Sequence, residues 1–344
     1  MTAERYDPRS TPWQVEDGAF YEIESPREQM EFLLRYAVLA PSSHNTQPWI
    51  FRIVEDGIQV SADYSRRLLL TDPDDRELLM SVGAAITNLR VAAAWFGFET
   101  TVMYEQRPEE SLPVAFVAIR ETSRTPEDLR RLFPAIRQRH TNRHVFNAEP
   151  LGADAVSAIC DVVDEHPGLL CLLRRQDQNR VADLIADGDR RLMDRPAVRE
   201  ELLNWLRPAG TTQGDGMCTD SISLSGPFPI TKWFIRNVNP GESAARRDRE
   251  LIKDAAALII VTAENDRAAL IRAGEVVERL LLTVTRYGLQ YSFLNQPIEV
   301  PELRQVLQGL ALTKSPPQLL VRIGRTNETT RPAPRRQVSS VIHP

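Results

Sequence analysis

The 344-residue chain is long enough to bury a full core and to form two domains or one large one. Its hydrophobic content of 42% and charged content of 26% are typical of a soluble globular protein. The net charge of -5 argues against a nucleic-acid-binding protein, because neutralising phosphates needs a concentrated basic surface. Arginine is abundant and lysine scarce, which favours planar contacts to a small anionic ligand.

The cysteines and the apolar runs indicate where the protein is found. Cys160, Cys171 and Cys218 lack a C-x-x-C spacing and leave one thiol unpaired in any disulfide scheme, which favours a reducing compartment. The apolar run 255–261 is too short to cross a bilayer, and the N-terminal stretch has no twin-arginine pair or hydrophobic signal region. We therefore expect a cytoplasmic protein.

Hydrophobic periodicity predicts alternating helices and strands. The first 25 residues lack periodicity and predict an arm that packs late or frays. Asp56-Gly57 predicts the turn of a hairpin, because this pair accommodates positive φ. The predicted helices cover 32–39, 74–97, 125–143, 153–165, 176–193, a long segment ending at 287, and 301–310; the predicted strands cover 50–54, 58–62, 114–119 (buried on both faces), 169–173, 255–261 and 318–323.

Residues 207–243 change in composition to Gly, Pro, Ser and Thr. A loop of this length in a compact domain is usually a lid or a binding loop. We expect this segment, which includes Trp233 and Phe234, to close over a site.

The chain contains a repeat. Residues 83–97 read GAAITNLRVAAAWFG and residues 274–288 read GEVVERLLLTVTRYG, with the same glycine spacing and with Leu89 and Leu280 in matching places. Two amphipathic helices with glycine C-caps can look alike by chance. We interpret the match as a duplication that produced two fused halves.

The stretch 40–49 joins a helical pattern to a strand pattern and carries small hydroxyls, an imidazole and two carboxamides between two prolines. Pro41 ends the helix, and Pro48 keeps the preceding residue out of helical space. The result is a rigid polar loop, which is a common place for a binding site. The polar residues could instead satisfy only the backbone groups of a turn.

Residues 139–143 read R-H-T-N-R and place two arginines four residues apart with a hydroxyl between them. On one helical face these groups could bind a phosphate. Solvated arginines at a helix C-terminus are an alternative. His140 and His144 could bind a metal, but the flanking cations and the lack of a third ligand disfavour it. Arg335-Arg336 is a second candidate anion clamp.

Other catalytic signatures do not occur. His44 stands beside Ser43, but no G-x-S-x-G elbow and no orienting acid support nucleophilic catalysis. The sequence contains no G-x-G-x-x-G and no G-x-x-x-x-G-K-[ST], so neither a Rossmann nor a P-loop nucleotide site is indicated.

Residues 41–49, P-S-S-H-N-T-Q-P-W, resemble the P-S-x-x-N-x-Q-P-W signature of nitroreductase-like flavoproteins, and residues 139–143 are similar to their R-x-[ST]-x-R flavin motif. The order of elements, the repeated helix and the closing Pro334-Arg335-Arg336 resemble most closely the Acg-type branch, in which two nitroreductase-like halves are fused. The resemblance spans residues 31–338. It implies an α+β nitroreductase-like fold with antiparallel or mixed sheets packed by helices.

The resemblance also implies FMN as the cofactor. Ordinary family members are homodimers with FMN at the subunit interface. Here it implies that Arg139, Thr141, Arg143, Arg335 and Arg336 hold the phosphate and the pyrimidine edge of the flavin, with His140 among them. It further implies that Ser42, Ser43, Asn45 and Gln47 approach from the other half, that Asp215-Gly216 offers a backbone N–H near flavin N5, and that Asn295 and its neighbours line the pocket.

The two motifs each occur once. The first half has no convincing R-x-[ST]-x-R and the second half has no copy of the polar loop, which predicts complementary halves and one FMN site per chain. We predict an N-terminal arm (1–25), a first half (26–125), and a second half (126–344) with an inserted lid (207–253). The oligomer is either a monomer with an intrachain pseudo-dimer or a homodimer.

The predicted function is FMN-dependent transfer of electrons from NAD(P)H to a nitroaromatic, a quinone or a related acceptor. A nicotinamide can stack on an open flavin face, so the missing Rossmann motif does not exclude NAD(P)H. A reduced flavin carries negative charge near N1 and O2, which a fixed guanidinium such as that of Arg143 would stabilise. The alternatives are a flavin-sequestering protein without turnover and a degenerate copy without cofactor.

Overall fold

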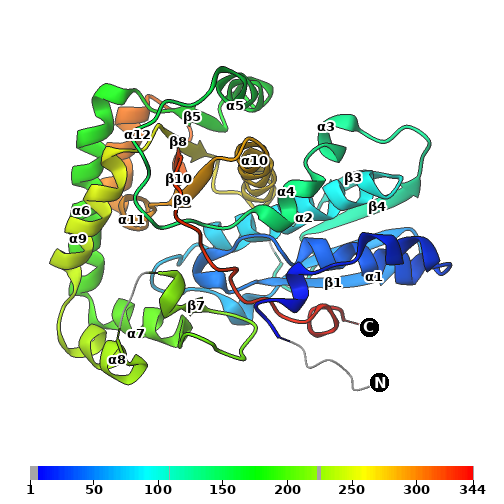
Figure 1. Ribbon diagram of the computed structural model, residues 1–344, viewed down its shortest axis with the longest axis horizontal. Helices are drawn as coiled ribbons and strands as arrows, with labels where there is room; N and C mark the ends of the chain where they lie inside the picture. Colours follow the sequence, from blue (N-terminus) through cyan, green and yellow to red (C-terminus); the bar gives the residue numbers. More distant parts are fainter. Residues whose placement is uncertain (1–6, 108, 223–225, 344) are drawn as a thin grey trace.

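The computed structural model describes residues 7–107, 109–222 and 226–343 and contains two four-stranded antiparallel sheets (Figure 1). The first sheet has the order β1-β2-β4-β3 and the second the order β5-β8-β10-β9. Counted along the chain, both sheets therefore have the order first, second, fourth, third. The strands are β1 (Trp49–Val54), β2 (Gly57–Ala62), β3 (Phe98–Tyr104), β4 (Ala115–Glu121), β5 (Leu170–Leu172), β8 (Ala257–Thr262), β9 (Gln290–Phe293) and β10 (Pro317–Gly324). The α+β class is confirmed.

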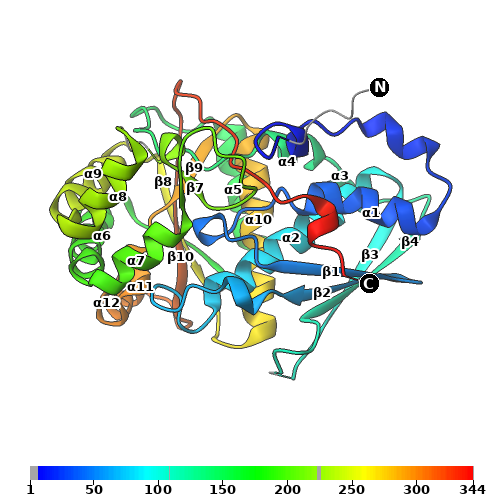
Figure 2. The same ribbon diagram turned by 90° about the horizontal axis from the view of Figure 1, so that it is seen from below.

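Two long helices, α2 (Arg76–Trp95) and α10 (Arg267–Arg286), lie between the two sheets (Figure 2). They touch at the two glycines of the repeat. A Cβ on Gly83 would lie 2.0 Å from the carbonyl oxygen of Ile271, and one on Gly274 would lie 2.0 Å from that of Met80. Each contact falls three residues before the opposite glycine, so the repeated glycine spacing has a reciprocal packing cause.

Helix α2 is the core helix of the first half. By length and composition it could cross a membrane, but 89% of its apolar window is buried inside the protein. Only Arg90 and Trp95 of its residues are not fully buried. This burial explains why the helix is apolar on nearly all sides.

The other helices cover the sheets and the space between them. α6 and α9 pack along each other on the outer side of the second sheet, and α1 lies beside β1 (Figure 1). These helices are α1 (Pro26–Ala37), α3 (Glu127–Arg130), α4 (Phe133–Gln138), α5 (Ala153–Glu165), α6 (Gln178–Asp194), α7 (Pro196–Trp205), α8 (Phe228–Asn237), α9 (Gly241–Lys253), α11 (Gln296–Glu299) and α12 (Pro301–Ala311). A short parallel pair, β6 (Leu206–Arg207) and β7 (Met217–Cys218), lies near α7.

Most predicted elements are present, and four differ. The predicted helix 125–143 is two short helices, α3 and α4. β4 is not buried on both faces, because its burial alternates after Ala115 as one face packs on helices. The predicted loop 207–243 contains α8 and the start of α9; residues 223–225 of it lie outside the described residues.

The N-terminal arm is the fourth difference. Residues 1–6 lie outside the described part, but Trp13 and Phe20 are buried, with exposed fractions of 8% and 5%. The Trp13 indole N–H donates to the carbonyl oxygen of Ala333 at 3.1 Å. Aromatic residues anchor this segment to the core, which periodicity cannot reveal in a segment without regular structure.

The last residues of the chain return to the first sheet. The backbone N–H of Phe51 in β1 donates to Val341 at 2.8 Å, and that of His343 donates to the carbonyl of Phe51 at 2.8 Å. The tail thereby covers the free edge of β1. The domain boundaries at residues 25, 125 and 207–253 stay a prediction.

Candidate functional site

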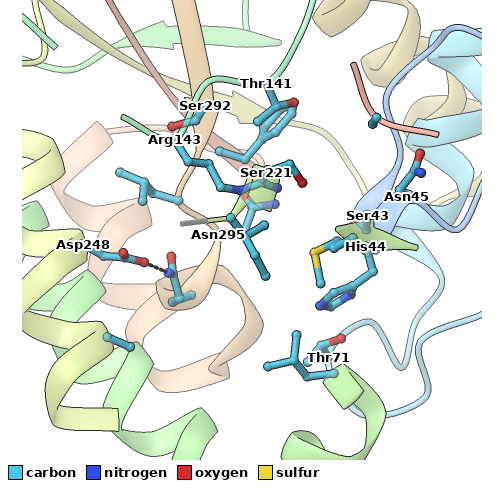
Figure 3. A pocket seen from close by; sticks show the side chains of 18 of the residues that line it. Ser43, His44, Asn45, Thr71, Thr141, Arg143, Ser221, Asp248, Ser292 and Asn295 are labelled. Carbon is cyan, nitrogen blue, oxygen red and sulfur yellow. Dashed lines mark hydrogen bonds between the residues drawn. The ribbon is translucent and has the colours of Figure 1, made fainter. Parts of the chain in front are cut away.

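A cavity of about 770 Å³ opens where the polar loop, residues 139–143 and the turn after β9 meet (Figure 3). Its volume lies within the range of small-molecule and cofactor sites. His44 and Thr141, nearly a hundred residues apart in sequence, both line it. The sequence-predicted site residues that line it are Ser42, Ser43, Asn45, Arg139, His140, Thr141, Arg143, Gly216, Asn295 and Arg335.

The polar loop has an unusual backbone. His44, Asn45 and Gln47 have φ angles of 49°, 55° and 52°, in the left-handed region that side chains other than glycine seldom occupy. Hydrogen bonds from distant segments hold this conformation. The Asn45 amide donates to the carbonyls of Gly216 at 3.0 Å and Pro334 at 2.9 Å. Such strain collects at functional sites, where the surrounding structure imposes it.

Arg143 lines the cavity and could bind an anionic ligand. Within the described residues, its side chain has no hydrogen-bond or ion-pair partner. Figure 3 shows the Arg143 side chain extending into the cavity, between the side that carries Asp248 and the side that carries Ser43 and His44. Burial lowers the pKa of the guanidinium, and the nearby Asp248 charge opposes that shift. A half-buried arginine of this kind is suited to binding an anionic group of a ligand.

Arg139, four residues earlier, is committed to the fold. It is 2% exposed, and its guanidinium contacts the Tyr291 hydroxyl at 2.5 Å and the Glu278 carboxylate at 3.1 Å. It also donates to the carbonyl oxygen of Leu39 at 2.5 Å, at the end of α1. Arg139 therefore ties α1, α10 and β9 together beneath the cavity.

Known proteins resemble this chain over most of its length. No protein-family profile matches the chain. It is 28% identical over 322 residues to the Mycobacterium tuberculosis (strain H37Rv) protein named "Putative NAD(P)H nitroreductase Rv3131", covering 92% of this chain and 91% of that protein. It is also 28% identical over 333 residues to "Putative NAD(P)H nitroreductase acg" of the same strain, covering 90% and 94%. The chain is thus similar over about nine tenths of its length to proteins with nitroreductase names.

Among solved structures, the chain is similar to one described as "a putative nitroreductase from anabaena variabilis". The two share 9% sequence identity, the match covers 91% of this chain and 92% of the other, and the TM-score is 0.46.

Three predicted cofactor residues do not line the cavity: Gln47, Asp215 and Arg336. The Gln47 amide donates to Gly214 at 2.7 Å and accepts from the backbone N–H of Arg336 at 2.9 Å. The Arg336 guanidinium donates to the Gln47 carbonyl at 3.1 Å. These residues shape the loop instead of facing a ligand.

The acidic-Gly loop also differs from the prediction. The Asp215 carboxylate forms ion pairs with Arg66 and with Arg207, at 2.9 Å in the second case. The Gly216 backbone N–H, proposed as the donor to flavin N5, donates to the carbonyl of Asn45 at 3.2 Å. A φ of 76° and a Cβ position 2.5 Å from the Trp205 carbonyl explain why glycine is needed there.

Arg335 lines the cavity but holds the loop. Its guanidinium donates to the carbonyls of Leu39 at 2.9 Å and Ala40 at 3.0 Å and to the side-chain oxygen of Asn45 at 3.0 Å. It also lies over the Trp13 ring, 4.8 Å from the centroid. Arg335, predicted as part of a second anion clamp, therefore binds backbone carbonyls of the polar loop.

The two histidines of the cavity are neutral near pH 7. Burial, with a smaller contribution from Arg143, lowers the pKa of His44 to about 4. Burial, followed by Arg139 and Arg335, lowers the pKa of His140 to about 3. Among the residues that the structure describes, no three His, Cys, Asp or Glu side chains gather as metal ligands.

No sequence motif indicated the carboxylic acids that line the cavity. Glu77, in the first turn of α2, is 5% exposed and accepts hydrogen bonds from the Ser43 hydroxyl and, at 3.1 Å, from the Asn295 amide. Burial, and then the charge of Asp72, raises the pKa of Glu77 to about 7. The one sequence feature that could have indicated Glu77 is its place at the start of an almost wholly apolar helix, where an acid is seldom buried.

Two further acids line the cavity, Asp189 of α6 and Asp248 of α9. The Gln296 amide donates to Asp189 of α6 at 3.2 Å and to Asp248 of α9 at 2.6 Å. Burial, and then the charge of Asp248, raises the pKa of Asp189 to about 7. Among the described residues, the cavity thus combines the Arg143 cation, which has no partner, with two carboxylic acids, Glu77 and Asp189, whose pKa values lie near 7.

Proposed function

We propose that the chain is an FMN-dependent oxidoreductase that passes electrons from NAD(P)H to a nitroaromatic, quinone or related acceptor. The observation that carries this proposal is the Arg143 guanidinium, which has no partner among the described residues and lies in a cavity bordered by both flavin-like motifs. The 28% identity to proteins named as NAD(P)H nitroreductases supports the reaction class and the donor.

The cavity fits a flavin mononucleotide in size and in polarity. Its volume of about 770 Å³ accommodates a molecule of that size, and Arg143 offers a cation for an anionic edge or a phosphate. The Nδ1 atom of His44 is buried without a hydrogen-bond partner, so a ligand polar group would satisfy it. When bound, FMN would supply the hydride chemistry. Arg143, His44 and Thr141 would hold it.

We further propose that the chain is an intrachain pseudo-dimer with one flavin site. The shared strand order and the reciprocal glycine contacts of α2 and α10 support it. The polar loop directly precedes β1 of the first sheet. Arg143 lies in the segment that leads from the first sheet to β5 of the second. Each half would therefore contribute one wall of the site.

A flavin-sequestering protein is the second candidate function. Helices α8 and α9 contribute Ile230, Phe234, Ala244 and Arg247 to the cavity lining, so the insert covers the site. A covered flavin would be protected from donors and acceptors. This arrangement favours storage if the cover does not open.

The visible spectrum of the purified protein with added FMN tests both candidates. A bound flavin should give its absorption bands, and NADH or NADPH should bleach them under anaerobic conditions if the protein is a reductase. Bound flavin that neither nucleotide bleaches would favour storage. A colourless protein that does not bind added FMN would contradict both.

A further inference from the structure

The carboxylate of Glu77 faces the cavity through two residues from different halves. One oxygen, Oε2, accepts from the Ser43 hydroxyl of the polar loop, and the other, Oε1, accepts from the Asn295 amide at the end of β9. All three residues line the cavity. Figure 3 shows the Ser43 and Asn295 side chains on facing sides of the same space.

The orientation of the Asn295 amide is fixed. Its side-chain oxygen accepts the backbone N–H of Leu320 at 3.0 Å, so its NH₂ group must be the one that faces Glu77. Because Oε1 already accepts from that amide, a proton on the Glu77 carboxyl belongs on Oε2. When Glu77 is protonated, the hydrogen bond between these two oxygens reverses: Oε2 donates to the Ser43 oxygen, and the Ser43 proton is free to point into the cavity.

The charges around Glu77 keep this carboxyl near its titration point. Asp72 and Arg76 face it from the N-terminal end of α2, and Glu299 faces it from α11. Arg76 is itself engaged, since it contacts Asp72 at 3.7 Å and donates to Gln318 at 3.2 Å. Asp189 of α6 adds a further negative charge near Glu299. Within the described residues, Glu77 forms no ion pair within 4.0 Å.

We propose that Ser43 and Glu77 deliver a proton to a substrate in the cavity, and that the acceptor is therefore one that is protonated on oxygen, such as a quinone. This inference rests on the proposed oxidoreductase function. Ser43 would contact the acceptor. Glu77 acts through Ser43 and is a positioning and proton-holding residue.

The step balances with the reductant that the proposed function names. FMN held by Arg143, His44 and Thr141 would supply a hydride, which carries two electrons and one proton equivalent, and one oxygen of the quinone would be left as a phenolate. The Ser43 O–H bond breaks as the phenolate O–H bond forms. The Glu77 O–H bond breaks as the Ser43 O–H bond is restored, and the Glu77 carboxylate then takes a proton from water.

A purely structural role for Glu77 is the competing explanation, because the carboxylate also joins the two halves through Ser43 and Asn295. The two explanations predict different pH profiles and different responses to acceptors. Potassium ferricyanide accepts one electron without taking a proton, whereas 1,4-naphthoquinone needs a proton to form its hydroquinone.

The experiment compares reduction of these two acceptors by the flavin-loaded protein and its variants under single-turnover conditions. Glu77→Gln keeps the size of the side chain but cannot supply the proton. We expect it to lower naphthoquinone reduction about 10²–10⁴-fold, as for loss of a general acid, and ferricyanide reduction less than tenfold. The wild-type naphthoquinone rate should fall as pH rises through about 7, and the variant should lack that limb.

Ser43→Ala is the second variant, and Glu275→Gln is the matched control. Ser43→Ala should show the same loss for naphthoquinone with Glu77 intact, which covers the case of a poorly folded Glu77 variant. Glu275 is a buried acid of α10 that contacts Arg90 and Tyr104 and does not line the cavity. Its variant should leave the ratio of the two rates unchanged.

A readout without flavin completes the test. The infrared difference between the wild type and Glu77→Gln should contain the C=O band of one protonated carboxyl that titrates near pH 7, because the bands of Glu278 and Asp189 are present in both proteins. If the wild type reduces both acceptors and Glu77→Gln keeps the wild-type ratio and pH profile, the proton-delivery role is wrong and the proposed function stands. If the wild type reduces neither acceptor, both are wrong.

Discussion

Two regions of this protein each hold an arginine beside a buried glutamate, and they use these charges differently. Beneath the cavity, Arg139 and Glu278 face each other at 3.1 Å. On the cavity wall, Arg143 and Glu77 each lack a partner of opposite charge within 4.0 Å among the described residues. The comparison teaches that the same residue types stabilise the fold where they pair and remain available for chemistry where they do not.

Breaking the paired region should have the largest effect. Arg139→Ala should lower the free energy of unfolding by about 3–5 kcal/mol, because it leaves the Glu278 carboxylate buried without its counter-charge. Chemical denaturation measures this loss. Arg236→Ala, which removes an exposed ion pair with Glu200, is the control and should cost at most about 1 kcal/mol. Equal losses in the two variants would show that Arg139 is not a structural cation.

Removing the available arginine should affect binding instead. Arg143→Ala should weaken FMN binding by about 2–5 kcal/mol, because it removes a buried cation from an anion contact. Its free energy of unfolding should change little, since no internal partner is lost. Fluorescence titration with FMN and chemical denaturation measure the two quantities. A variant that purifies with a full complement of flavin would contradict the role assigned to Arg143.

The pH dependence of stability sharpens the comparison between the glutamates. The pKa of Glu77 is raised from its ordinary value to about 7, so its contribution to stability is fully present below the ordinary value. That contribution is lost as pH rises through about 7. The wild type should therefore lose at most about 3 kcal/mol relative to Glu77→Gln between pH 5 and 8. Glu278 and Asp189 also titrate near 7, so only the difference between the two proteins isolates Glu77.

The smallest expected effect comes from Asn295. Its amide donates to the Glu77 carboxylate and lowers the pKa of that group. Asn295→Ala should raise the Glu77 pKa further, by roughly 0.5–1 unit for one lost hydrogen bond. The infrared titration measures the shift. A midpoint that moves to lower pH would mean that the amide does not stabilise the charged form.

The sequence predicted the parts of the fold that depend on local pattern. The Asp56-Gly57 hairpin is present, with Val54 opposite Gly57, and the repeated glycines mark the contact between α2 and α10. Each of these sequence signals lies within a single helix or a single turn, so it can be recognised without the three-dimensional structure. The helix α8 escaped prediction because its segment is rich in Gly and Pro at both ends and its apolar face is largely exposed.

The site could be predicted only as a set of candidates. R-x-T-x-R cannot show which arginine is available, because the partners of Arg139 are Leu39, Glu278 and Tyr291, about a hundred or more residues away. The same reason hides the roles of Arg335 and Arg336. Glu77 belongs to no motif, and its significance arises only when Ser43 and Asn295 are brought to it in three dimensions.

The segment from Pro334 to His343 holds the polar loop and covers the edge of β1. During synthesis, the polar loop can therefore take its final form only after residues 334–343 have left the ribosome. A nascent chain that stops before Arg335 would lack the contacts from Arg335 and Arg336 and could keep those from Gly214 and Gly216. The binding site thus matures well after the strands of the first sheet have been synthesised.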